Sequence, residues 1–186
     1  MATADGRRGR EAAQVRRSLL RRPGVLVMAS LGLAAVIALA LPVAAGSAQL
    51  VWNVTPSAPA GLYRIVREPW SRGNRVAVLP GEMLSADLDR RGVLAKGRLL
   101  IKRAAAVTGD RVCRHGAEVS INGEPAAKAR DVDSHGLPLP SWQGCVTLDD
   151  GQVFLLGDTP GSYDGRYFGV TPSAEIVGQA AIVLAF

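Results

Sequence analysis

The feature that most constrains this chain is an uncharged stretch of 23 residues, 24–46, composed mainly of Val, Leu, Ile and Ala. As a helix it would be about 35 Å long, which exceeds the hydrocarbon core of a bilayer at about 30 Å. Seven arginines precede it within residues 1–22, against two acidic residues, Asp5 and Glu11. Because basic residues stay on the cytoplasmic side, we expect a cytoplasmic tail at 1–22, a transmembrane helix at 23–46 and a translocated domain at 47–186.

A cleaved signal peptide is the alternative for this region, since residues 44–48 are small. The apolar core of a signal peptide usually spans about 7–15 residues, and this stretch is longer. The formal net charge of +6 is concentrated before the apolar stretch and is not interleaved with aromatic residues. That distribution argues against a nucleic-acid partner and for contact with a lipid bilayer.

Residues 47–186 show several short apolar runs separated by Gly- and Pro-rich turns. We expect strands at 62–66, 75–79, 98–107, 111–113, 118–121, 153–156 and 176–186, and a helix at 82–91. Asn122-Gly123 is a strong hairpin signal. This pattern predicts a mainly β domain of antiparallel sheets, with an irregular excursion at about 113–145.

The two cysteines, Cys113 and Cys145, fall in the part that we expect to be translocated. An oxidising compartment favours a disulfide, which closes a loop of about 30 residues and stabilises the fold by about 3–4 kcal/mol. His115 and His135 lie between the cysteines, which keeps a zinc site as an alternative. Their spacing matches no common zinc motif, so we expect no metal.

Lys102 is one of three lysines among 22 basic residues. It follows Ile101 and precedes Arg103 in the most strand-like run after residue 50, so alternation turns one of the two basic side chains towards the core. Lysine can lose its charge on burial, whereas arginine cannot. A neutral lysine is a general base that can take a proton from a serine hydroxyl.

Ser57 is the strongest candidate for that serine. Pro56 and Pro59 flank it and keep it out of a regular strand, only 11 residues beyond the apolar stretch. From composition alone, a capping or turn serine in a stalk is the favoured interpretation of Ser57.

Three groups of residues, in this order, resemble the motifs of type I signal peptidases, and the serine motif is most similar to the TraF-type conjugative transfer peptidases. They are Asn53-x-Thr55-x-Ser57-x-Pro59-x-Gly61-x-Tyr63, then Leu100-Ile101-Lys102-Arg103 with Gly109-Asp110, then Gly157-Asp158 with Ser162-Tyr163-Asp164-Gly165-Arg166-Tyr167-Phe168-Gly169. The resemblance implies a signal-peptidase-like catalytic domain that needs no cofactor.

The resemblance also implies roles for single residues. Ser57 matches the nucleophile and Lys102 the general base. Thr55 matches a residue whose hydroxyl completes an oxyanion hole, and Ser162 one that orients the lysine. Asp164 and Arg166 match a supporting pair behind the site, although Thr159 and Gly165 depart from the general secretory pattern.

These observations together predict a serine endopeptidase at the outer face of the cytoplasmic membrane, single-pass, with a cytoplasmic N-terminus. Its partner would be a membrane-tethered precursor, and the TraF-like motif implies a pilin or another transfer component. The alternatives are a general signal peptidase acting on secreted proteins and a non-catalytic assembly protein of a conjugation apparatus.

Overall fold

The computed structural model describes residues 23–44 and 48–186. The chain divides into two units, residues 1–46 and 47–186. In the first unit the apolar stretch is helical as α2, Pro23–Ala44. Judged on the described residues, no helix is both long and apolar enough to span a membrane. The expected basic tail at 1–22 lies outside the described residues, as do residues 45–47.

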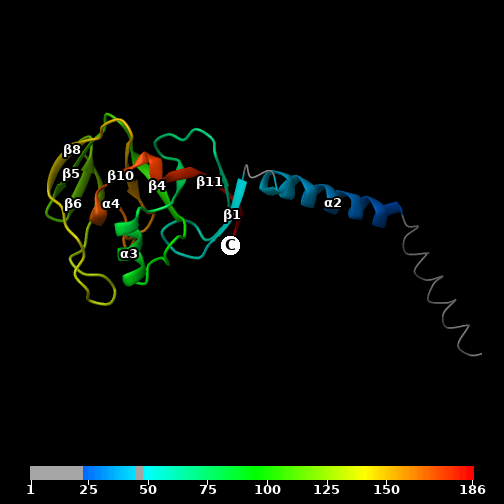
Figure 1. Ribbon diagram of the computed structural model, residues 1–186, viewed down its shortest axis with the longest axis horizontal. Coiled ribbons are helices and arrows are strands. Elements are labelled where there is room, and N and C mark those ends of the chain that lie inside the picture. The colour runs from blue at the N-terminus through cyan, green and yellow to red at the C-terminus, as the bar shows by residue number, and fades with distance from the viewer. Residues whose placement is uncertain (1–22, 45–47) are drawn as a thin grey trace, which may run out of the picture. The chain divides into compact units, whose positions relative to one another are not determined.

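A seven-stranded antiparallel sheet forms most of the second unit (Figure 1). Its strand order is β1-β2-β11-β3-β4-β9-β10. The strands are β1 (Ala48–Asn53), β2 (Gly61–Val66), β11 (Ile176–Ala185), β3 (Arg75–Val78), β4 (Leu100–Ala106), β9 (Gln152–Leu156) and β10 (Val170–Pro172). The C-terminus lies beside β1, where the rings of Phe186 and Trp52 stack with their centroids 5.1 Å apart.

A second antiparallel sheet has the order β7-β6-β5-β8. Its strands are β5 (Arg111–His115), β6 (Glu118–Ile121), β7 (Glu124–Lys128) and β8 (Gly144–Thr147). The predicted hairpin joins β6 to β7 through Asn122 and Gly123, both with positive φ, as a tight hairpin turn requires. Much of the span 113–145 is therefore regular, and the irregular part is confined to residues 129–143.

The helices of this unit are short: α3 (Glu82–Arg90), α4 (Gly165–Phe168) and the 3-10 helix η1 (Ser173–Glu175). One core cluster joins the two sheets and contains Ala105 and Ala106 of β4, Val112 of β5, Val119 of β6 and Phe154 of β9. The prediction of a mainly β, antiparallel domain is confirmed.

Candidate active site

Lys102 lies in the middle of β4, opposite Val76 of β3, and its side chain is only 2% exposed. Its neighbour Arg103 faces the other way and is about 40% exposed, so alternation has turned the lysine inwards as predicted. Burial lowers the pKa of Lys102 from 10.5 to about 8, with a smaller contribution in the same direction from the nearby Arg166. The carboxylates of Asp164 and Asp158 act in the opposite direction and hold part of the charge.

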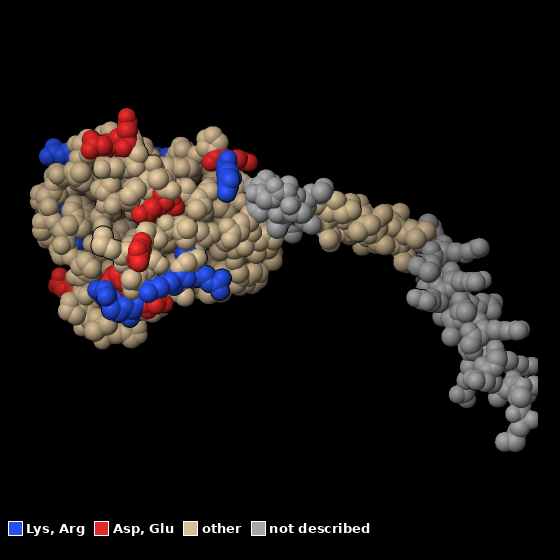
Figure 2. Space-filling view, in the orientation of Figure 1, with Lys and Arg blue, Asp and Glu red and all other residues tan. Residues whose placement is uncertain are grey.

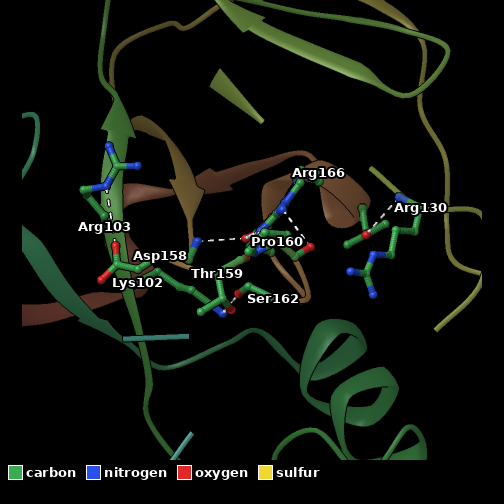
Figure 3. Close-up of polar contacts among 11 residues, drawn as sticks. Lys102, Arg103, Arg130, Asp158, Thr159, Pro160, Ser162 and Arg166 are labelled. Carbon is green, nitrogen blue, oxygen red and sulfur yellow. Dashed lines mark hydrogen bonds and ion pairs between the residues drawn. The ribbon is translucent and has the colours of Figure 1, made fainter. Parts of the chain in front are cut away.

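Among the residues that the structure describes, the Lys102 amine has one hydrogen-bond partner. Its Nζ donates a hydrogen bond to Ser162 Oγ at 2.5 Å. Ser162 is itself buried, and it follows Gly157 in the loop between β9 and α4. The contact fixes the end of a flexible side chain and aims its nitrogen (Figure 3).

Ser57 lies in the turn between β1 and β2, and Asn53 organises that turn. The side-chain amide nitrogen of Asn53 lies within 3.1 Å of three carbonyl oxygens, those of Thr55, Ala58 and Pro59. Its Oδ1 accepts a 2.8 Å hydrogen bond from Thr55 Oγ1. Ser57 Oγ is 3.1 Å from Thr55 Oγ1. Because the Thr55 hydroxyl donates its proton to Asn53 Oδ1, Ser57 is the donor in the hydrogen bond between Ser57 and Thr55.

Gly157 is the point where the serine turn and the lysine side meet. A Cβ at this position would lie 2.0 Å from Ser162 Oγ and 3.2 Å from the carbonyl oxygen of Ser57. The next residue, Asp158, donates its backbone N–H to that same carbonyl at 2.9 Å. Only glycine therefore allows the Ser57 turn and the Ser162 side chain to approach so closely.

Asp164 and Arg166, close to Ser162 in the sequence, form a buried ion pair. Asp164 Oδ2 accepts from Arg166 Nη2 at 2.6 Å and from the backbone N–H of Gly157 at 2.7 Å. The guanidinium of Arg166 also donates to the carbonyl oxygens of Thr159 and Pro160. The pair thus fastens both ends of the loop that carries Ser162, which a lysine in place of Arg166 could not do because it lacks the planar fork of donors.

A cleft of about 630 Å³ opens at these residues. Ser57, Lys102 and Ser162 share its lining with Thr55 and with β1 and the segment before β4. In the described part of the chain, the hydroxyl of Ser57 forms its hydrogen bond with Thr55 Oγ1 and not with Lys102 Nζ. The hydroxyl must therefore turn from Thr55 towards the amine before a proton can pass between them.

The structure brings together all six predicted site residues, those on the serine turn (Ser57 and Thr55) and those around the amine (Lys102, Ser162, Asp164 and Arg166). Two positions that organise them were not singled out from the sequence, Asn53 and Gly157. Both fall inside the quoted motifs. The roles of Asn53 and Gly157 can be recognised only once the geometry of the two turns is known.

The cysteines form the predicted disulfide between β5 and β8, where Cys113 and Cys145 are directly opposite. His115 Nε2 lies 3.9 Å from Cys145 Sγ. Three of the four residues of the zinc alternative, Cys113, His115 and Cys145, therefore lie together, without His135. The two sulfurs are bonded to each other and supply no thiolate. The disulfide lies on the second sheet, away from the residues that line the cleft.

Comparison with known proteins identifies the class. The sequence model of the family described as signal peptidase, peptidase S26, matches residues 22–185. The chain therefore belongs to this family of peptidases.

Its curated relatives are TraF proteins. The chain is 37% identical over 145 residues to a probable conjugal transfer protein TraF of Sinorhizobium fredii, covering 72% of this chain and 76% of the relative. It is 34% identical to the conjugal transfer protein TraF of Agrobacterium fabrum, covering 72% of this chain and 81% of the relative. It is also 34% identical to the TraF protein of Agrobacterium tumefaciens, covering 82% of this chain and 92% of the relative. A solved signal peptidase I from Enterococcus faecalis is 22% identical with a TM-score of 0.37, over 61% of this chain and 97% of that one. That structural likeness is too weak to support an argument.

Proposed function

We propose that this chain is a membrane-anchored serine endopeptidase in which Ser57 is the nucleophile and Lys102 the general base. The observation that carries the proposal is a buried lysine, with its pKa lowered to about 8, on the wall of the cleft that also contains Ser57. A pKa near the working pH lets an amine both take and return a proton.

The chemistry follows from these positions. Ser57 Oγ attacks the scissile carbonyl carbon while Lys102 Nζ takes the hydroxyl proton, and the ammonium then protonates the departing amine as the peptide bond breaks. An ester between Ser57 and the new carboxyl end remains. Lys102, neutral again, takes a proton from water as the water oxygen attacks the ester carbon. The ammonium then returns that proton to Ser57 Oγ as the ester C–O bond breaks, which releases the acid and restores both residues.

The oxygen that becomes negative needs hydrogen-bond donors. Within residues 48–186 no acceptor is bonded to the backbone N–H of Ser57, so this donor is available. The Thr55 hydroxyl is used on Asn53 and accepts from Ser57. The turn of Ser57 towards Lys102 removes only the hydrogen bond that Thr55 Oγ1 accepts. To donate as the second member of an oxyanion hole, the Thr55 O–H must also rotate away from Asn53 Oδ1.

We further propose that the substrate is a membrane-tethered precursor of a conjugative transfer system, such as a pilin, cut at the outer face of the cytoplasmic membrane. The curated relatives are conjugal transfer proteins, which supports the system. The uncharged stretch and its arginine-rich flank support the anchor and the orientation.

The peptidase activity is tested with the purified full-length chain and a pilin precursor. Ser57→Ala and Lys102→Ala should lower processing by at least about 10³-fold, and Lys102→Arg should be equally inactive because arginine stays charged. Lys128→Ala is the matched control, since Lys128 is exposed, pairs with Glu118 at 3.5 Å and does not line the cleft. The proposal is refuted if Ser57→Ala processes the precursor at the wild-type rate, and also if the wild type does not process it at all. Precursors of secreted proteins, run in parallel, separate a transfer-specific enzyme from a general one.

The orientation is tested separately in intact cells. A membrane-impermeant thiol reagent should label Ser141→Cys and should not label Thr3→Cys until the membrane is permeabilised. Ser141 is exposed in the second unit. The reverse labelling pattern contradicts the proposed topology.

A further inference from the structure

A second cleft, of about 270 Å³, adjoins the one that contains Ser57. Val93 and Tyr163 line both clefts, so an extended chain lying in the first can continue into the second. Its other walls come from Tyr167 of α4 and from the irregular segment after β7, including Arg130 and Leu139. The mechanism above uses none of the groups that are specific to this cleft.

Two arginines line the cleft, and the first, Arg91, is held by several contacts. Arg91 Nε is 3.0 Å from Asp87 Oδ2, and Arg91 Nη1 is 3.8 Å from Asp133 Oδ2 and donates to the carbonyl oxygen of Pro138 at 3.1 Å. Its guanidinium carbon also lies 5.4 Å from the centroid of the Tyr163 ring. These contacts tie the irregular segment to α3 and give the cleft a fixed wall.

The second arginine, Arg130, has its charge uncompensated. Its backbone N–H donates to Tyr167 Oη at 3.1 Å, which fixes the main chain, while its side chain is exposed (Figure 3). Among the described residues, no carboxylate lies within ion-pair distance of its guanidinium. Asp133, the acidic residue of the cleft, is used by Arg91 and by the backbone N–H groups of His135 and Leu137.

Among the described residues that line the cleft, Asp133 is the one acidic side chain. On the face shown in Figure 2, Lys and Arg side chains are interspersed with Asp and Glu. The cleft combines aromatic and aliphatic walls, from Tyr163, Tyr167 and Leu139, with the exposed guanidinium of Arg130, for which the described residues provide no acidic partner. A guanidinium of this kind is matched by a carboxylate.

We infer that the second cleft is a specificity subsite that takes an acidic side chain of the substrate, paired with Arg130. The inference rests on the proposed function, because the occupant is the same peptide that Ser57 cuts. It predicts that precursors are selected by a glutamate or aspartate at a fixed distance from the cleaved bond, in addition to the residues next to that bond.

The test uses fluorescence-quenched peptides of one neutral, alanine-rich sequence. A single glutamate is moved through successive positions on both sides of the cleaved bond, and each peptide is paired with its glutamine counterpart. With the full-length wild type, glutamate at one or two neighbouring positions should raise kcat/KM about 3- to 10-fold over glutamine, as expected for a partly exposed charged hydrogen bond. Arg130→Gln should abolish this ratio, and Arg130→Glu should favour lysine at the same position.

Arg111→Gln is the matched control, because Arg111 is exposed on β5 and lines neither cleft, so the ratio should persist. Equal cleavage of every glutamate and glutamine pair overturns the inference, and so does a ratio that survives in Arg130→Gln. If the wild type cuts no peptide, the proposed function fails by itself. Fluorescence anisotropy of labelled peptides on the Ser57→Ala protein then decides the subsite: tighter binding of the glutamate peptide that depends on Arg130 supports it, and equal binding refutes it.

Discussion

Burial of the Lys102 side chain destabilises its charged form and thereby makes the neutral amine, the form that can act as a base, more abundant. Removing an ammonium from water destabilises its charged form, so the pKa falls from the ordinary 10.5 to about 8. At pH 7 about one molecule in ten then carries a neutral amine, against about one in 3,000 for a lysine in water. Asp164 and Asp158 prevent a larger fall.

Ser162→Ala tests how far the orientation of this amine matters. The variant loses the 2.5 Å hydrogen bond to Lys102 Nζ but leaves the burial of the lysine in place. We expect kcat to fall about 10- to 100-fold with KM changed little, because the misplaced base acts mainly in the chemical step. Ser141→Ala, at an exposed position, is the control. An unchanged kcat in Ser162→Ala would show that the contact does not position the base.

The residues of the site could be predicted to different extents. Lys102 and Ser162 follow from alternation and from the motif spacing, and the structure places them in contact. The organising role of Asn53 could not be predicted, because it depends on three carbonyls that only the folded turn brings to one amide.

At the scale of elements, the site is made where two turns meet. The β1–β2 turn carries Ser57, and the loop from β9 to α4 carries Ser162. Gly157 lets them approach, and the Asp164–Arg166 pair fastens the second loop. Strand β4 contributes Lys102 itself, and the other strands support the two loops.

Gly157→Ala tests this arrangement directly. The added Cβ would overlap Ser162 Oγ, so we expect Ser162 to be displaced, activity to fall at least about 10-fold and the melting temperature to drop. Gly161→Ala is the matched control for stability, since a Cβ there has no neighbour within 4 Å, and its melting temperature should be unchanged. Wild-type activity in Gly157→Ala would contradict the close approach.

Elements with a strong local signal were predicted well, and those that depend on distant partners were not. β4, β6 and the Asn122-Gly123 hairpin show alternation and turn chemistry in the sequence. β7 was missed because Pro125 indicated a loop, yet proline is tolerated on an edge strand, and β7 is at the edge of its sheet. β1 pairs only with β2, and nothing local distinguishes it from the end of the apolar stretch.

At the scale of the whole second unit, the two sheets contribute to different properties of the protein. The seven-stranded sheet carries the cleft, whereas the four-stranded sheet carries the disulfide and shares a core with β4 and β9. Stability and catalysis should therefore respond to different changes.

Replacing both Cys113 and Cys145 by serine tests this division. Loss of a cross-link spanning 32 residues should lower the free energy of unfolding by about 2–4 kcal/mol, measured by urea denaturation. Because neither cysteine lines the cleft, kcat/KM at 25 °C should stay within about 2-fold of the wild type. A large loss of activity without a loss of stability would show that the second sheet takes part in catalysis.

The pH dependence of kcat/KM tests the central claim most directly, since it reports the pKa of the free enzyme's essential base. The active form of Lys102 is the neutral amine, and burial lowers the pKa of this amine to about 8. Activity should therefore rise about 10-fold per pH unit below about pH 8 and level off above it. A rise that continues towards 10.5, the value of a lysine in water, or a flat profile from pH 6 upwards, would contradict a buried Lys102 acting as the base for Ser57.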